Sequence, residues 1–360
     1  MTPALASSRF ARRVVDSLAS LAVAVALVAT VATFGAGVAH AADARHEVVI
    51  ACQDLVLPWR YAQATGLVEK ATGYKVTYRK FASGAEVIRA LASGSAQLGE
   101  AGSSPIAAGL SQGVDISLFW ILDNINDAEA LVARNGSGIT SVAALKGKTV
   151  GVPFVSTSHF HTLVALEHAG VNPADVKIVN LRPPEVAAAW QRGDIDATWI
   201  WDPVLAQVKK NGRVLITSGQ VAKATGKATF DGFVADRRFA KDNADFMAKF
   251  VSVLAAADAD YRAHRAHGAA WTAASPQVAA IAKASGANPQ DVPASLALYA
   301  FPTPAEQAST AWLGGGAQSG AAQSLLATAT FLKAQGAIQN VLPDYSAGVD
   351  PQFVQRVPAH

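Results

Sequence analysis

Residues 102–105 read Gly-Ser-Ser-Pro, and residues 152–159 read Val-Pro-Phe-Val-Ser-Thr-Ser-His. Each stretch is a hydroxyl-rich turn that follows a predicted strand and opens a predicted helix. A helix start presents unpaired backbone N–H groups and the positive end of the helix dipole. Added serine and threonine hydroxyls make such a start a receptor for an anion. Two such starts in one chain therefore predict a protein that holds a small anionic molecule.

Around these two turns the chain alternates between strand and helix patterns. This alternation predicts an α/β fold with mainly parallel strands. Apolar runs predict strands at 47–52, 74–81, 97–99, 116–121, 129–133, 149–153, 176–180, 195–201, 214–218 and 230–235. Periodic runs predict helices at 83–92, 156–170, 185–192, 246–265, 277–284 and 320–334. From residue 236 onward the chain is mostly helical.

The order of these elements predicts two lobes. We expect residues 42–133 and 231–360 to form lobe one and residues 134–230 to form lobe two. The chain would then cross between the lobes near Ala133 and again near Phe230, which makes a two-strand hinge with a cleft beside it. Ligands of such sheets bind beyond the carboxyl ends of the strands. Within the first turn, Pro105 suits the first helical position, with Ser104 as the cap.

The first 41 residues predict an export signal. Three arginines between residues 9 and 13 form a basic region, an apolar run follows over residues 18–38, and Ala-His-Ala ends it at 39–41. This order is typical of a secretory signal peptide that is cut before Ala42. The apolar run is also long enough to span a membrane, so a retained anchor is the alternative.

The composition of the remaining chain excludes several classes of partner. Removing the three arginines and one aspartate of residues 1–41 from 30 basic and 27 acidic residues leaves 27 and 26, which is near neutral. No basic stripe remains to favour nucleic acid or a membrane surface. A single cysteine, Cys52, excludes an internal disulfide. Export without disulfides suggests a bacterial periplasm.

Five segments resemble a known protein family: residues 79–84 (RKFASG), 89–94 (RALASG), 102–105, 152–159 and 189–196 (AWQRGDID). They resemble the periplasmic solute-binding proteins of ABC importers, in particular the taurine-binding type, and the resemblance covers nearly the whole mature chain. It implies a type II periplasmic binding-protein fold that closes on its ligand. It also implies capture of taurine (2-aminoethanesulfonate) and delivery to a membrane permease driven by a cytoplasmic ATPase. We expect a monomer without cofactor or metal.

The expected ligand is a zwitterion, so it needs donors at one end and a carboxylate at the other. Hydroxyls and N–H groups at the two helix starts are suited to the sulfonate, because its charge is spread over three oxygens. Each hydrogen bond to such a charged group contributes about 1.5–3 kcal/mol. The expected contacts from both lobes are Gln53, Ser83, Gly84, Ser103, Ser104, Ser156, Thr157, Ser158 and His159.

The ammonium of the ligand needs a carboxylate, and Asp231 is the candidate. It lies on the predicted return strand at the hinge, and the resemblance implies an aspartate at this position. A plain alkanesulfonate would leave Asp231 buried and unpaired, at a cost of about 3–5 kcal/mol. Trp201 could stack on the ligand or offer its ring face to the ammonium, which contributes about 0.5–2 kcal/mol.

Each of these residues has a structural alternative. Ser104 and Ser158 could be ordinary helix caps, and Asp231 could cap a turn before Gly232. His159 and His161 would point apart on a helix, which disfavours a metal site.

Three carboxylates depart from the family pattern: Asp54, Glu100 and Asp202. Facing the cleft, they would suit a larger or more cationic amine; outside it, they would be solvated charges. Another aliphatic sulfonate or a small amine-bearing anion is therefore the alternative ligand.

Two other classes of function compete with transport. An enzyme on the same fold is disfavoured because the chain has no Gly-x-Ser-x-Gly elbow and no complete triad around Ser156 and His159. A sensor or chemotaxis adaptor would share both fold and site, and neighbouring genes for a permease and an ATPase would favour import.

Overall fold

The computed structural model of the protein describes residues 46–268 and 270–357. The predicted signal peptide at 1–41, and its alternative as a membrane anchor, lie outside these residues. Within the two described ranges, no helix combines the length and apolar character needed to cross a membrane.

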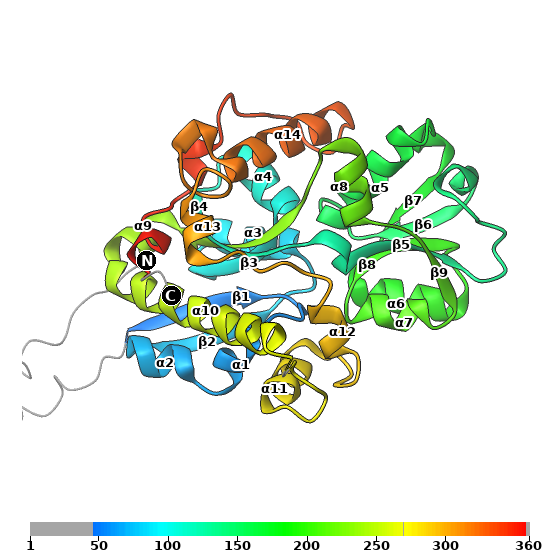
Figure 1. The fold of residues 1–360 in the computed structure, drawn as a ribbon. Helices are drawn as coiled ribbons and strands as arrows, with labels where there is room; N and C mark the ends of the chain where they lie inside the picture. The colour runs from blue at the N-terminus through cyan, green and yellow to red at the C-terminus, as the bar shows by residue number, and fades with distance from the viewer. Residues whose placement is uncertain (1–45, 269, 358–360) are drawn as a thin grey trace, which may run out of the picture. The chain divides into compact units, whose positions relative to one another are not determined.

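Two five-stranded mixed sheets organise the chain from Glu47 onward (Figure 1). The first sheet has the order β2-β1-β3-β10-β4 and the second β7-β6-β8-β5-β9. The strands of the first sheet are β1 (Glu47–Cys52), β2 (Lys75–Lys80), β3 (Leu98–Gly102), β4 (Ile116–Asn124) and β10 (Phe230–Asp236). Those of the second are β5 (Glu129–Arg134), β6 (Thr149–Val152), β7 (Lys177–Asn180), β8 (Ala197–Trp201) and β9 (Gly212–Thr217). The predicted α/β class is confirmed.

One strand in each sheet runs against the other four. In the first sheet it is β10, which pairs antiparallel with β3 and β4. In the second sheet it is β5, which pairs antiparallel with β8 and β9. Each of these strands begins directly after the chain crosses from one sheet to the other. The two crossings form the hinge of a type II binding-protein fold.

The strand β5 was expected in lobe one, and the structure places it in the second sheet. Its five register pairs join residues 129–133 to the strand Ala197–Trp201. The chain therefore crosses between Asn124 and Glu129, earlier than the predicted boundary after Ala133. The sequence pattern missed this because β4 and β5 are both continuous apolar runs, and such runs do not show which sheet they join.

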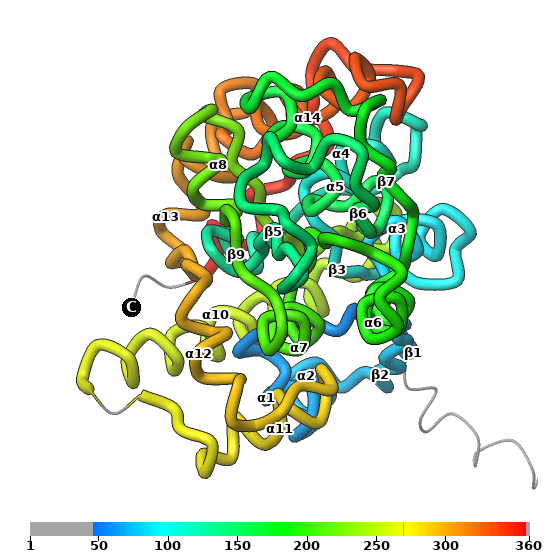
Figure 2. The backbone as a smooth tube through the Cα atoms, turned by 90° about the vertical axis from the view of Figure 1, so that its right-hand side faces the viewer, coloured from blue at the N-terminus to red at the C-terminus, as the bar shows by residue number. Residues whose placement is uncertain are grey.

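Helices cover both faces of each sheet. In the first sheet, α4 (Ser103–Ser111) and α14 (Gly320–Ala334) lie on one side, and α1 (Arg60–Ala64), α2 (Leu67–Thr72) and α10 (Ala244–Ala266) lie on the other. In the second sheet, α5 (Thr157–His168) and α8 (Ser218–Thr225) lie opposite α6 (Pro183–Arg192) and α7 (Val204–Lys209), as Figure 2 also shows. The remaining helices are α3 (Gly84–Ala92), α9 (Arg237–Asp242), α11 (Pro276–Ser285), α12 (Val292–Leu296) and α13 (Pro304–Ala308), with short 3-10 turns between elements.

Candidate functional site

Strand ends from both sheets meet at one small cavity. It is lined by Gln53, Leu55, Gly84, Gly102, Pro105, Glu129, Ser156, Thr157, Trp201 and Asp231. The parallel strands β1, β3 and β8 end there, and the two reversed strands β5 and β10 begin there. The cavity measures about 20 Å³, which is close to the room of one or two water molecules. The lobes are therefore closed on each other, and a larger molecule enters only when they separate.

The first helix start at this cavity is that of α4. Its cap is Gly102, which has no side chain to bond the first backbone N–H groups. Ser103 and Ser104 follow in the first helical turn, so the predicted role of Ser104 as the cap is wrong. Both serine side chains are fully buried, and neither hydroxyl has a hydrogen-bond partner among the described residues. A buried hydroxyl without a partner costs about 1–3 kcal/mol, which a bound acceptor would recover.

The second helix start is that of α5, and its hydroxyls are largely engaged. Ser156 is the cap: its Oγ accepts from the backbone N–H of His159 at 3.0 Å and donates to the carbonyl of Pro153 at 2.6 Å. Thr157 Oγ1 donates to Glu129 Oε1 at 2.6 Å. Ser158 is also buried, and a hydrogen bond from its side chain favours the charged form of Glu129.

The turn before α5 is strained. Val155 has a φ of 61°, which is rare for a β-branched side chain. Its backbone N–H donates to His159 Nδ1 at 3.3 Å, and the ring of His159 stacks on Phe154 with 4.5 Å between centroids. Burial lowers the pKa of His159 to about 4, so the ring is neutral at physiological pH. His159 therefore shapes the turn and does not line the cavity.

The two lobes touch at a glycine. A methyl group placed on Gly102 would lie 2.7 Å from Thr157 Cγ2 of the other sheet and 3.2 Å from Asp231 Oδ1. The first distance is shorter than carbon atoms tolerate, so only a glycine allows this closed arrangement. Gly102, Thr157 and Asp231 therefore define the point where the lobes and the hinge converge.

Two carboxylates line the cavity. Asp231 begins β10, and burial, followed by the charges of Glu129 and Glu100, raises its pKa well above the ordinary value. Glu129 begins β5 and is the register partner of Trp201. Burial raises the pKa of Glu129 to about 7, although hydrogen bonds from Thr157, Ser158 and Ser218 oppose the shift. A cation placed between these groups would favour their charged forms.

A buried ion pair holds the first strand's end at the cavity. Arg60 Nη2 lies 2.7 Å from Glu100 Oε2, and both side chains are fully buried. The same guanidinium donates to the carbonyl of Gln53 at 2.6 Å, and Gln53 Nε2 donates to the carbonyl of Glu100 at 3.0 Å. Trp59 Nε1 also donates a hydrogen bond to Glu100 Oε1 at 2.8 Å. Glu100 thus fixes Gln53 without lining the cavity itself.

The other two unusual carboxylates also lie outside the inner cavity. Asp202 is buried and accepts from the backbone N–H of Ala206 at 2.7 Å. Asp54 pairs with Lys80 at 2.5 Å on the wall of an outer cavity of about 420 Å³, which Trp201 also lines. The reading of these carboxylates as solvated charges is therefore wrong for Glu100 and Asp202, which are buried.

The structure brings together six of the eleven predicted residues as lining groups: Gln53, Gly84, Ser156, Thr157, Trp201 and Asp231. Ser83, Ser103, Ser104, Ser158 and His159 lie behind the lining, each next to a lining residue or within two positions of one. Ser83 caps α3, with its Oγ 3.4 Å from the backbone nitrogen of Glu86. His161 turns away from the cavity, and its ring nitrogens contact Ser218 Oγ and the carbonyl of Lys227.

Four lining residues were not among the predicted contacts: Leu55, Gly102, Pro105 and Glu129. Gly102 and Pro105 were part of the quoted turn but were not chosen as contacts. Glu129 could have been found from the sequence, because it is the one acid of its strand and stands directly before the apolar run of residues 130–133.

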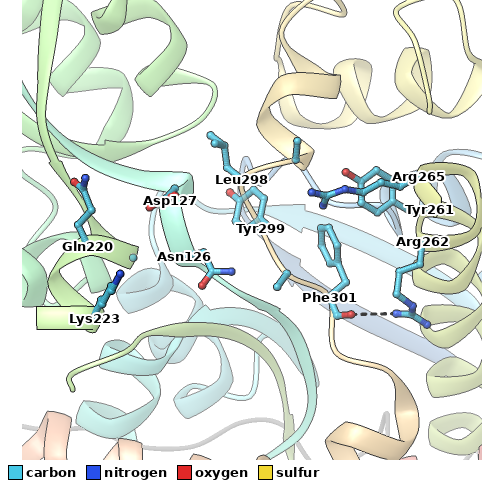
Figure 3. Close-up of a pocket in the computed structure, with 13 residues that line it drawn as sticks. Asn126, Asp127, Gln220, Lys223, Tyr261, Arg262, Arg265, Leu298, Tyr299 and Phe301 are labelled. Atoms are coloured by element: carbon cyan, nitrogen blue, oxygen red, sulfur yellow. Dashed lines mark hydrogen bonds between the residues drawn. The ribbon is translucent and has the colours of Figure 1, made fainter. Parts of the chain in front are cut away.

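A second and larger space, of about 660 Å³, lies on the hinge side (Figure 3). Lys223 and Gln220 of α8 face Arg262 and Arg265 of α10 across it, and Tyr299 lies between them. None of the predicted ligand contacts lines this space.

These features define a two-lobed binding protein whose cleft closes on a small polar ligand. The family model described as NMT1/THI5 like matches residues 58–267, and the chain belongs to this family. It is 38% identical over 308 residues to the taurine-binding periplasmic protein of Escherichia coli (strain K12), covering 86% of this chain and 92% of that relative. The resemblance stated from the sequence is thereby confirmed.

Solved structures show the same fold. The alkanesulfonate-binding protein from Xanthomonas axonopodis pv. citri bound to MOPS matches with a TM-score of 0.68 and 25% identity, over 83% of this chain and 97% of that one. The periplasmic aliphatic sulphonate binding protein from Escherichia coli matches with a TM-score of 0.63 and 25% identity, over 87% and 97%.

Proposed function

We propose that this protein is the periplasmic solute-binding component of an ABC importer and that it captures taurine. The observation that carries the proposal is the content of the inner cavity: two helix starts and two carboxylates, Asp231 and Glu129, line the same small space. The sulfonate would take the N–H groups and hydroxyls at the starts of α4 and α5. The ammonium would lie against Asp231, with Glu129 as a second carboxylate within the cavity.

A zwitterion is the ligand class that satisfies both halves of this cavity. A plain anion would meet the positive helix starts but would face Asp231 and Glu129, which repel it when ionised. A plain cation would satisfy the carboxylates but would leave the buried hydroxyls of Ser103 and Ser104 unpaired. A short molecule with an anion at one end and an ammonium at the other removes both costs.

The geometry of the nucleophilic side chains supports binding without catalysis. Ser156 Oγ contacts the backbone of Pro153 and His159, and the His159 ring accepts from Val155, so Ser156 and His159 form no serine–imidazole bond with each other. Cys52 is buried, and burial raises its pKa to about 12, which leaves the thiol protonated and unreactive.

Transport is supported by the relatives and by the leader. The Escherichia coli relative is named as a taurine-binding periplasmic protein, and the predicted signal peptide would place this chain in the same compartment. A closing two-lobed monomer suits delivery to a membrane permease with a cytoplasmic ATPase, because the closed form differs in shape from the open form.

Isothermal titration calorimetry on the chain from Ala42 tests the ligand. Taurine, ethanesulfonate and ethylamine separate the zwitterion from its two halves. We expect a one-to-one complex with taurine and at least a hundredfold weaker binding of either half, since each leaves buried partners unpaired. Equal affinity for ethanesulfonate would assign the protein to aliphatic sulfonates without an amine. Consumption of taurine during the titration would contradict a binding role.

A further inference from the structure

A third carboxylate lies directly behind the ammonium site. Asp123, near the end of β4, is the register partner of Asp231 at the start of β10. Partners in an antiparallel pair place their side chains on the same face of the sheet, with Cβ atoms about 4.5–5.5 Å apart. A register shift follows immediately, between Asp231 and Gly232, and such irregularities re-aim side chains next to binding sites.

Asp123 has an unusual environment for a carboxylate. Its relative exposure is 0%, no side chain of the described residues donates a hydrogen bond to it, and a backbone hydrogen bond from Asp231 is what favours its charged form. Burying an isolated carboxylate in its charged form is far more costly than burying a neutral acid. The groups around it add to that cost rather than offset it, since those whose charges act on Asp123 are Asp231, Asp258 of α10 and Glu129 of β5.

The other ionisable groups that interact with the pair are acids or a tyrosine. Burial, followed by the charges of Asp123 and Asp231, raises the pKa of Tyr299. This tyrosine also lines the hinge-side space of Figure 3. Glu100 of β3 acts on Asp231. The nearby cations are already engaged: Arg60 pairs with Glu100, and the charge of Arg262 acts on Asp258. The closed site therefore holds no free counter-charge for the pair among the described residues.

We propose that Asp123 is a positioning residue for the ligand's ammonium: it shares a proton with Asp231 in the empty site, and this proton leaves when an ammonium binds at Asp231. The inference rests on the proposed function. The ammonium keeps its own protons, the O–H bond of the carboxylic acid breaks, and the proton passes to solvent. The bound ammonium then faces two carboxylates of the first sheet instead of one.

This role follows from the behaviour of paired acids. Two adjacent carboxylates that cannot both ionise retain one proton, and that proton belongs to the pair. Burial, then the charge of Asp231, raises the pKa of Asp123 well above its ordinary value, in agreement with this reading. A cation at Asp231 favours ionisation of both members, so taurine binding and proton release are linked.

Titration calorimetry in two buffers of different ionisation enthalpy measures the released proton. For the parent protein we expect up to one proton released per taurine, and an affinity that rises with pH by up to tenfold per pH unit while the pair still holds its proton. An affinity for taurine that is independent of pH, with no proton released, would overturn the inference while leaving the proposed function intact. Absence of taurine binding would overturn both.

Asp123→Asn distinguishes positioning from a merely structural role. Removing the second acid lowers the pKa of Asp231, so the variant should release fewer protons. It should match or exceed the parent's affinity at the acidic end of the range and fall below it at the alkaline end. A loss of equal size at every pH would contradict the inference. Asp202→Asn is the matched control, a buried acid away from the pair, and its proton release should equal the parent's. Should Asp123→Asn fail to fold, the two-buffer measurement on Glu129→Gln decides, because this variant lacks the other acid of the cavity that could release a proton: retained proton release supports the inference, and its loss overturns it.

Discussion

The starts of α4 and α5 face the same cavity but use their hydroxyls differently. At α5, Ser156 bonds to its own turn and Thr157 bonds to Glu129, so most of the polar atoms serve the protein. At α4 the cap is a glycine, and the hydroxyls of Ser103 and Ser104 have no partner among the described residues.

The difference shows that two similar hydroxyl-rich helix starts can have different roles at one binding site. The start of α4 is left open for an acceptor, which suits it to contact the ligand directly. At the start of α5 the hydroxyls are already bonded within the protein, so this helix start positions other groups. Thr157 packs against Gly102 of the other lobe and holds the carboxylate of Glu129 by a hydrogen bond. One helix start supplies donors, and the other supplies closure and a carboxylate.

Replacing Asp231 should have the largest effect on taurine affinity, because it removes the carboxylate proposed to bind the ammonium. Asp231→Asn should weaken taurine binding by about 3–5 kcal/mol, or roughly two to four orders of magnitude, while ethanesulfonate binds no worse. Calorimetry with both ligands measures the difference. Equal losses for the two ligands would mean that Asp231 supports the fold and not the ammonium.

Glu129 should make the stability of the empty protein depend on pH. Its pKa is raised from 4.5 to about 7, so the folded state holds a proton that the unfolded chain has already lost. The free energy of unfolding therefore falls as pH rises from 4.5 to 7, by about 3 kcal/mol from this group.

Glu129→Gln lacks that titration, so its stability relative to the parent should increase with pH across the same window. Urea unfolding at several pH values tests this. The buried His159 and His161, whose pKa values are lowered to about 4, contribute the opposite slope in both proteins and cancel in the difference. A constant difference would show that Glu129 is already ionised in the empty site.

Gly102 tests closure separately from charge. Its φ of −70° suits any residue, so Gly102→Ala adds no backbone strain but places a methyl group against Thr157 Cγ2. We expect taurine affinity to fall by about 1–3 kcal/mol, as in overpacked sites. Thr157→Ser, added to Gly102→Ala, removes the opposing methyl and keeps the hydroxyl on Glu129, so it should restore much of the loss. No recovery in the double variant would place the clash elsewhere.

The smallest effects should separate the two helix starts. Ser156→Ala removes a cap and should lower the free energy of unfolding by about 1 kcal/mol. Ser104→Ala removes a buried hydroxyl without a partner and should leave stability unchanged or higher, while taurine binding weakens by about 1.5 kcal/mol. Thermal unfolding and calorimetry on both variants measure the contrast. The same response from both would remove the distinction between an open and an engaged start.

Local patterns predicted most of the fold, because apolar runs and caps act within a few residues. The strand Glu47–Cys52 and the helix Gly84–Ala92 lie where the sequence indicated. The placement of β5 depended on pairing with a strand some seventy residues later, which no local pattern contains. The cap of α4 is Gly102 and not the predicted Ser104. The close packing of Gly102 against the other lobe, and not the cap preference of serine, fixes this position.

The candidate site was predictable where its chemistry lies in a motif and hidden where it arises from long-range contact. The two turns and Asp231 could be selected from the sequence and the family resemblance. Glu129 gains its role from Thr157, 28 positions away, and Asp123 from its register with Asp231. Both are single acids at the ends of apolar strands, which is the signal to look for in related chains.

A crystal structure of the taurine complex tests the central claim most directly. The account predicts the ammonium nitrogen within hydrogen-bond distance of the Asp231 carboxylate, and sulfonate oxygens on the N–H groups and hydroxyls at the start of α4. A sulfonate bound elsewhere in the cleft, or an ammonium that points to solvent away from Asp231, would contradict it.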